Sequence, residues 1–306
     1  MVRGGTYYGN VPSWTPQVSL DQMDSNGVAT SLLSMSTPGS WFGSVDDGRR
    51  MSREVNELAA RMIGDHPGRF GLFAAIPLPD TEGSLKEIEY AFETLRADGI
   101  GIMTSYDTVP VGDKSFAPVF EELNRRGAII FMHRTAATCC INLLQLQDKP
   151  EGASNAPREF IIDDLRAINS LLTSGTFARF PNIRWIHGHG EATLPWLAQL
   201  SGVADSHGRP MQRPDGGANP AYAPQGVLKE LQKIYVDSSG TSKYMMDQLR
   251  NLGMLSNRTM FRTDVPYGNV ANSLRSLRAQ QNGLSPAEIA AIEYGTAHQL
   301  FPKYRS

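Results

Sequence analysis

Several features are scarce in this sequence of 306 residues, and each scarcity argues against a class of protein. Neither charge sign predominates, because 29 Lys and Arg stand against 31 Asp and Glu, so no basic field favours nucleic acid or an anionic membrane. No apolar run approaches the roughly 20 residues that a membrane-spanning helix needs. The first residues lack the apolar core of a secretory signal. We therefore expect neither a nucleic-acid partner nor a membrane partner.

Cysteine is almost absent. The only two, Cys139 and Cys140, are adjacent and make a poor disulfide framework, so the expected compartment is the reducing cytoplasm. Apolar residues make up 41% and charged residues 20% of the chain, which rules out a disordered or fibrous class. The length is common for one barrel of alternating strands and helices with loop insertions.

Short apolar runs alternate with segments of helical periodicity along the chain. The run that ends at His133 has four consecutive apolar residues, which is typical of a strand buried on both faces in a parallel sheet. Seven such strands are predicted, at residues 28–35, 70–76, 99–103, 128–133, 183–189, 234–237 and 260–264. Helices are predicted between them, at residues 19–26, 46–64, 85–97, 116–126, 158–173, 194–200 and 242–252, and from residues 273, 286 and 296.

This alternation predicts an α/β fold, a distorted (β/α)₈ TIM barrel whose first strand is degenerate or missing. Only Thr6–Tyr8 could supply that strand. No linker or repeat divides the chain, so a single domain over residues 1–306 is expected. The polar stretch Ser206–Gln225 is predicted to be a loop insertion that covers a site or contacts a partner subunit.

Three predicted strands end at residues that can bind metals or transfer protons: His133, His189 and Asp264. Each alone has an ordinary explanation, as a histidine held by a backbone hydrogen bond or a carboxylate in a turn. A barrel gathers its strand ends at one edge, so the three should converge on a divalent ion such as Zn²⁺. His187 precedes His189 by two positions and should point to the same side of the strand. The two could form a two-ligand metal element; we favour one functional histidine with the other packed beside it.

Several segments resemble the amidohydrolase-related decarboxylases, a family that includes aminocarboxymuconate semialdehyde decarboxylase, and are most similar to its 6-methylsalicylate decarboxylase branch. The resemblance extends from about Trp14 to the C-terminus. It rests on Ser36–Gly43, His66–Pro79, Phe116–Gly127, Phe131–His133, Gly188–Pro195 and Thr263–Pro266.

The resemblance implies a barrel that holds one Zn²⁺ or Mn²⁺ and decarboxylates a small aromatic acid without an oxidant. It assigns His133 and Asp264 as metal ligands, and His189 as the catalytic acid or base, with Asp264 as the other candidate proton donor. Relatives take two more ligands from a His-x-His or Glu-x-His motif on strand 1, which this sequence lacks. They also usually carry proline where Arg134 follows His133.

Three functions remain open from the sequence. The first is metal-dependent decarboxylation of a 6-methylsalicylate-like acid, with Arg134 pairing with the carboxylate and Trp41 or Phe42 stacking on the ring. Core packing explains Trp41 and Phe42 equally well. The second is a metal-dependent hydrolase on the same barrel. The third is a non-catalytic relative that has lost its metal. Exposed strand edges beside a missing strand predict a homo-oligomer, with a homodimer as the expected form.

Overall fold

The computed structural model describes residues 12–135, 156–189, 193–200, 221–238, 242–279, 281 and 283–305. The predicted strand at Thr6–Tyr8, the cysteines Cys139 and Cys140, and residues 206–220 of the predicted loop insertion lie outside these ranges.

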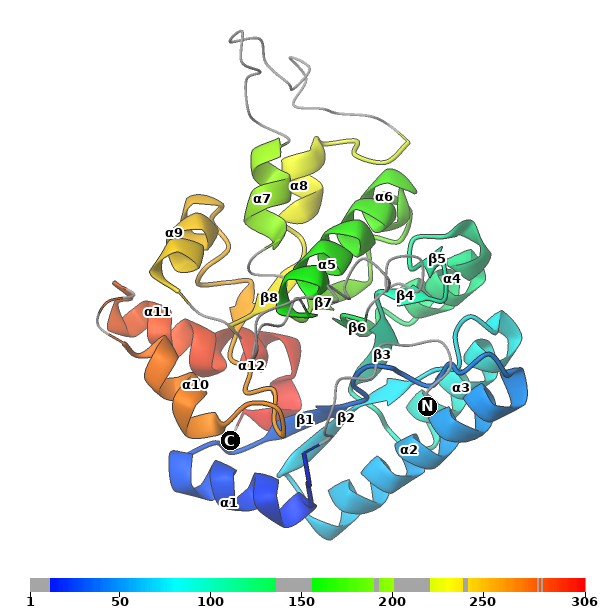
Figure 1. The fold of residues 1–306 in the computed structure, drawn as a ribbon, viewed down its shortest axis with the longest axis horizontal. Coiled ribbons are helices and arrows are strands. Elements are labelled where there is room, and N and C mark those ends of the chain that lie inside the picture. Colours follow the sequence, from blue (N-terminus) through cyan, green and yellow to red (C-terminus); the bar gives the residue numbers. More distant parts are fainter. Residues whose placement is uncertain are drawn as a thin grey trace, which may run out of the picture.

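A curled parallel sheet forms the centre of the described structure (Figure 1). Its strands follow one another in the sheet in the same order as in the chain, and every neighbouring pair is parallel. The seven strands are β1 (Ser31–Ser34), β2 (Phe70–Ala75), β3 (Gly99–Met103), β6 (Ile129–His133), β7 (Arg184–His187), β8 (Tyr235–Asp237) and β9 (Thr259–Met260). All seven predicted strands are present, and the predicted barrel class is confirmed.

Helices connect the strands and cover the outside of the sheet (Figure 1). The α-helices are α1 (Pro16–Asn26), α2 (Val45–Asp65), α3 (Thr81–Glu93), α4 (Ala117–Arg125), α5 (Ala156–Thr173), α6 (Thr176–Arg179), α7 (Thr193–Leu200), α8 (Val227–Leu231), α9 (Lys243–Asn251), α10 (Val270–Leu277), α11 (Pro286–Ala290) and α12 (Thr296–Leu300). Shorter helical turns are η1 (Lys114–Phe116), η4 (Ala291–Gly295) and η5 (Pro302–Tyr304). None of the helices in the described ranges is both long and apolar enough to cross a membrane.

Four short strands and α-helices were not predicted. The hairpin of β4 (Ser105–Tyr106) and β5 (Val109–Pro110) has two residues per strand, and helices α6 and α8 have four and five residues. Elements of this length are too short to show a periodic apolar pattern. The sequence therefore carries no signal by which periodicity could find them.

Two apolar layers flank the sheet, because successive strand residues point to opposite faces. Ile130 and Met132 of β6 contact the helices in the outer layer, whereas Phe131 points into the curl of the sheet. The inner cluster consists of Phe73, Ile129, Phe131, Ile186, Met260, Leu300 and Phe301. Side chains of the C-terminal helix α12 thus help to fill the interior that the strands enclose.

The sheet is open between its two edge strands, β1 and β9, which do not pair with each other in the part of the chain that is described. A cavity of about 690 Å³ lies at this opening. Its wall includes residues of β1, α2 and α12 together with His133 and Asp264. The opening between the first and last described strands therefore leads to the strand ends.

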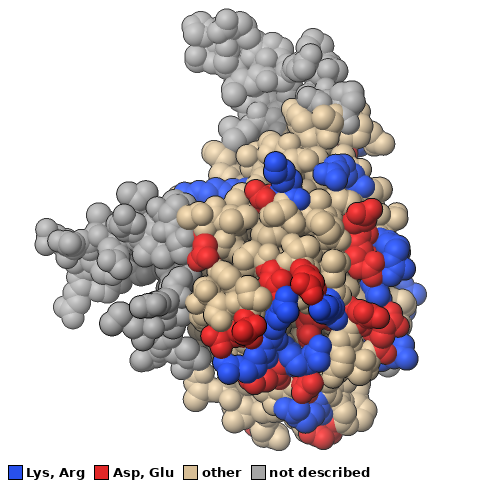
Figure 2. All heavy atoms as spheres, turned by 90° about the vertical axis from the view of Figure 1, so that its right-hand side faces the viewer, with Lys and Arg blue, Asp and Glu red and all other residues tan. Residues whose placement is uncertain are grey.

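Charges of both signs are mixed on the surface drawn in Figure 2, where Lys and Arg lie among Asp and Glu. Ion pairs across α2 and its neighbours include Arg49–Asp80 at 2.6 Å and Arg53–Glu87 at 2.8 Å. In both pairs the arginine is half-exposed and the carboxylate is largely buried. Because each of these arginines lies next to a carboxylate, this face of the molecule carries no large field of one sign.

Candidate metal and active site

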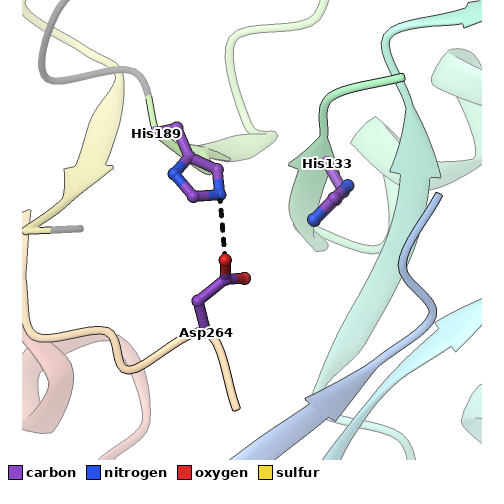
Figure 3. Close-up of side chains that lie close together, drawn as sticks. All are labelled: His133, His189 and Asp264. Atoms are coloured by element: carbon purple, nitrogen blue, oxygen red, sulfur yellow. Dashed lines mark ion pairs between the residues drawn. The ribbon is translucent and has the colours of Figure 1, made fainter. Parts of the chain in front are cut away.

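His133, His189 and Asp264 converge at the edge of the sheet where its strands end (Figure 3). His133 is the last residue of β6, His189 follows β7 by two residues, and Asp264 follows β9 by four. One ligand atom from each residue lies within 4.8 Å of the others. His189 Nε2 is 3.8 Å from Asp264 Oδ2, and the two imidazole centroids are 6.0 Å apart. Residues up to 131 positions apart in sequence thus offer their donor atoms to one small volume.

The hydrogen bond of His133 decides which ring nitrogen faces the cavity. His133 Nδ1 lies 2.7 Å from the carbonyl oxygen of Arg134, which can only accept, so Nδ1 carries the proton. Nε2 then keeps its lone pair. Burial, and next the charge of Arg262, lower the pKa of His133 to about 3. The ring is therefore neutral at pH 7 and chemically suited to ligate a metal.

His189 is held by its backbone in an uncommon conformation. Its φ is 60°, and its amide N–H donates to Asp237 Oδ2 at 3.1 Å. Burial, and next the charge of Arg262, lower the pKa of this histidine to about 2. The imidazole is neutral at pH 7 in the metal-free chain, and Nε2 faces the carboxylate of Asp264.

Arg262 links the two carboxylates at this edge of the sheet. Its Nη2 donates to Asp264 Oδ1 at 2.5 Å, and its Nη1 donates to Asp237 Oδ2 at 2.9 Å. Asp264 Oδ2 is the oxygen nearer to His189. The arginine therefore fixes one carboxylate oxygen and leaves the other directed at the imidazoles.

The chemistry of these donors fits a divalent cation. Two neutral imidazoles and one carboxylate are ligand types that Zn²⁺ and related first-row ions accept. Donors that each lie about 2.0 to 2.2 Å from one ion are at most about 4.4 Å apart. Because the three donor atoms lie within 4.8 Å of one another, small side-chain movements would let them share one ion. The ligands' other polar atoms are hydrogen-bonded as well: His133 Nδ1 donates to the Arg134 carbonyl, and Asp264 Oδ1 accepts from Arg262.

His187 does not join His189 in a two-ligand element. It is the last residue of β7 and is buried against α5, where its Nε2 lies 3.4 Å from Asp164 Oδ1. The expectation that both histidines point to the same side was wrong, because the strand ends at His187 and the positive φ of His189 turns the chain. Spacing alone could not reveal that turn.

The three residues predicted to bind substrate lie in two loops. Arg134 directly follows His133, and after burial and Arg262 its charge also lowers the pKa of both site histidines. Trp41 donates from Nε1 to Asp107 Oδ2 at 2.6 Å and packs against the outer apolar layer. Phe42 is half-buried beside it. The described cavity wall includes none of Arg134, Trp41 and Phe42, so their binding role stays a prediction.

Sequence reasoning missed Arg262, Asp237 and Phe131, all of which line the cavity. The sequence positions of Asp237 and Arg262 could have indicated these two residues. Asp237 ends a predicted strand as Asp264 does, and Arg262 precedes Asp264 by two positions. Phe131 precedes His133 by two positions, so its side chain shares the inner face of β6.

The family model for amidohydrolase matches residues 14–303. A relative named decarboxylase yanB, from Aspergillus niger, is 32% identical over 310 residues, which cover 97% of this chain and 81% of that protein. A 6-methylsalicylic acid decarboxylase from Penicillium expansum is 36% identical over 193 residues, 61% of this chain and 57% of that protein. The chain belongs to the amidohydrolase family, as the sequence motifs predicted.

Solved structures share the fold. The 5-carboxyvanillate decarboxylase LigW from Sphingomonas paucimobilis superposes with a TM-score of 0.76 at 25% identity, covering 92% of this chain and 82% of that chain. A 5-carboxyvanillate decarboxylase from Novosphingobium aromaticivorans, complexed with manganese and a nitrobenzoic acid, gives a TM-score of 0.74 at 20% identity, covering 92% and 79%. These relatives and structural neighbours are thus named as decarboxylases, and the second of the two solved structures contains manganese.

Proposed function

We propose that this protein is a metal-dependent carboxy-lyase that decarboxylates a small aromatic acid with an ortho hydroxyl group, such as 6-methylsalicylate. The observation that carries the proposal is the convergence of His133, His189 and Asp264 within 4.8 Å of one another beside a cavity. Relatives named as decarboxylases of aromatic acids support the reaction class.

His133 and Asp264 would hold the metal, which we propose to be Zn²⁺ with Mn²⁺ as the alternative. His133 offers Nε2 because Nδ1 is committed to the Arg134 carbonyl, and Asp264 offers Oδ2 because Arg262 holds Oδ1. A bound divalent cation would neutralise the negative charge of the substrate's carboxylate and phenolic oxygen and fix their orientation.

His189 is proposed to deliver the proton. The reaction protonates the ring carbon that bears the carboxylate, breaks the bond from that carbon to the carboxylate, releases CO₂ and restores the aromatic ring. Burial and Arg262 disfavour a charged His189. His189 would therefore take up its proton together with the substrate and pass it to the ring carbon.

The cavity wall offers an aromatic face for the substrate ring. Phe131 stacks on Phe73 with centroids 5.2 Å apart and lies beside His133 on β6. Arg134, Trp41 and Phe42, in the loops that follow β6 and β1, are proposed to orient the carboxylate and cover the ring. Exclusion of water by these side chains would strengthen every charge interaction inside the cavity.

The proposal is tested by incubating purified, Mn²⁺-loaded protein with 6-methylsalicylate and measuring CO₂ and 3-methylphenol. We expect equal amounts of both products. The variant His189→Gln should keep its metal and lose about a hundredfold or more of kcat. His133→Ala should lose the metal, and the control His66→Gln at the end of α2 should match wild type. Metal-loaded wild-type protein that releases no CO₂ from any ortho-hydroxy aromatic acid contradicts the proposal.

We further propose that the single domain over residues 1–306 works in the cytoplasm as a homo-oligomer, in the simplest form a homodimer. The open edges of β1 and β9 support this, because unpaired strand edges favour association. Light scattering should give at least twice the mass of one chain. A monodisperse monomer contradicts it.

A further inference from the structure

Arg262 is a largely buried part of the site. Its side chain is 14% exposed, and its guanidinium carbon lies 5.4 Å from the centroid of the Phe131 ring. A Cβ atom at Gly188 would lie 2.7 Å from Nη1, so the glycine leaves the space that the guanidinium uses. The hydrogen bonds to Asp237 and Asp264 then hold this cation between the ends of β8 and β9.

The guanidinium and a divalent cation would share one carboxylate. Asp264 Oδ1 accepts from Arg262, and Asp264 also supplies a ligand atom to the cluster with His133 and His189. Both cations are positive and would lie only a few ångströms apart. At an effective dielectric constant of about 20 their repulsion is large compared with thermal energy.

Arg262 also has an effect of the opposite sign, because a hydrogen bond orients the carboxylate of a ligand. Interactions that orient a ligand typically improve metal affinity by about 10- to 100-fold. The repulsion between a double and a single positive charge only a few ångströms apart exceeds this even when partly screened by solvent. The repulsion is therefore the larger of the two effects, and Arg262 lowers the metal affinity overall.

We propose that Arg262 is an internal competitor of the metal ion for Asp264. Its guanidinium keeps Asp237 and Asp264 paired in the metal-free chain, and it weakens the binding of a divalent cation, so that the ion exchanges readily. This inference rests on the proposed metal site but not on the identity of the substrate.

The test is a Mn²⁺ titration of the full-length, chelator-stripped protein at one neutral pH without substrate, followed by calorimetry and by the electron paramagnetic resonance signal of free Mn²⁺. Arg262→Met should bind Mn²⁺ about tenfold more tightly than wild type, or tighter still. Arg262→Lys keeps the charge and should stay close to wild type. Arg258→Met loses the same charge near Tyr235, away from the cavity wall, and should not change affinity.

Two results would overturn the inference. If folded Arg262→Met binds Mn²⁺ equally or more weakly, while His133→Ala binds none, the metal site stands and the competition is disproved. If no variant and no wild-type sample binds Mn²⁺, the proposed metal site and the inference fail together. Neither result depends on CO₂ release, so the reaction is judged separately.

A second measurement covers the case in which Arg262→Met does not fold. Wild-type protein with isotope-labelled arginine is titrated with diamagnetic Zn²⁺, and the guanidinium resonances of Arg262 are assigned by their absence in Arg262→Lys. The competition predicts that these resonances shift or broaden as Zn²⁺ binds, because Arg262 loosens from Asp264. Unchanged resonances at saturating Zn²⁺ would overturn it.

Discussion

The side chain of Asp163 stabilises the chain segment next to the site through hydrogen bonds, although it contacts no proposed metal ligand. It is 3% exposed, accepts a hydrogen bond from Thr104 Oγ1, and Thr104 in turn accepts from the backbone N–H of Thr135 at 2.9 Å. The Thr135 hydroxyl lies 2.9 Å from that of Thr37 in the loop after β1. This network fixes the segment that leaves β6 directly after His133 and Arg134.

The buried carboxyl group gives a pH-dependent prediction. Burial, and to a smaller degree the charge of Asp164, raise the pKa of Asp163 to about 6. Between about pH 4 and pH 6 the folded state holds a proton that the unfolded state has lost, so stability falls as pH rises across this window. Asp163→Asn replaces the carboxyl group with an amide that stays neutral at every pH in this window. Its stability relative to wild type should therefore rise by about 2 to 3 kcal/mol from pH 4 to pH 6 and level off above.

Urea unfolding of both proteins at several pH values between 4 and 7.5 measures this difference. A difference in unfolding free energy that stays constant with pH would show that Asp163 is ionised in the fold.

At the scale of elements, hydrogen bonds of the Asn56 side chain join helix α2 to strand β2. Its side chain is fully buried, accepts from the Ala75 N–H and donates to the Ala75 carbonyl, both at 2.8 Å, and also donates to Glu87 of α3. Asn56→Ala would leave both backbone groups of Ala75 without their partner. We expect the unfolding free energy to fall by about 2 to 4 kcal/mol.

Arg50→Ala on the same helix is the matched control. Arg50 is 65% exposed and its partner Asp47 is 52% exposed, so the change should cost less than about 1 kcal/mol. Equal losses for the two variants in urea unfolding would show that the Asn56 bonds contribute little.

The elements and the site differ in how far the sequence could predict them. The strands were found because unbroken apolar runs mark a buried parallel sheet, and His133 and Asp264 stand out because each ends such a run. The pairing of Arg262 with Asp237 is a tertiary contact between residues 25 positions apart in the sequence. The position of His189 on the cavity side, opposite to His187, depends on its own backbone angle, which spacing does not encode.

For the whole molecule, the C-terminal segment closes the side of the barrel away from the metal site. Phe301 is 6% exposed and packs edge-to-face on Phe73 with centroids 5.8 Å apart. Beyond it, Lys303 and Tyr304 bind the carboxylate of Asp98 at 2.8 and 3.0 Å. The same carboxylate accepts from the backbone of Leu72 in β2. These bonds connect the segment that follows α12 to β2 and to the residue before β3.

Phe301→Ala should lower the unfolding free energy by about 3 to 5 kcal/mol, because it leaves a cavity in the inner cluster. Tyr244→Ala serves as the control, since Tyr244 is 70% exposed and should cost less than about 1 kcal/mol. A folded Phe301→Ala variant with nearly unchanged stability in denaturant would mean that α12 does not support the barrel.

The convergence of three strand ends on one ion is tested most directly by anomalous diffraction from crystals of the protein soaked in Mn²⁺. We expect one strong anomalous peak in the cavity, at a bonding distance of about 2.0 to 2.3 Å from His133 Nε2 and from an oxygen of Asp264, with His189 beside it. A map at saturating Mn²⁺ with no peak there, or with peaks only at surface carboxylates, would contradict it.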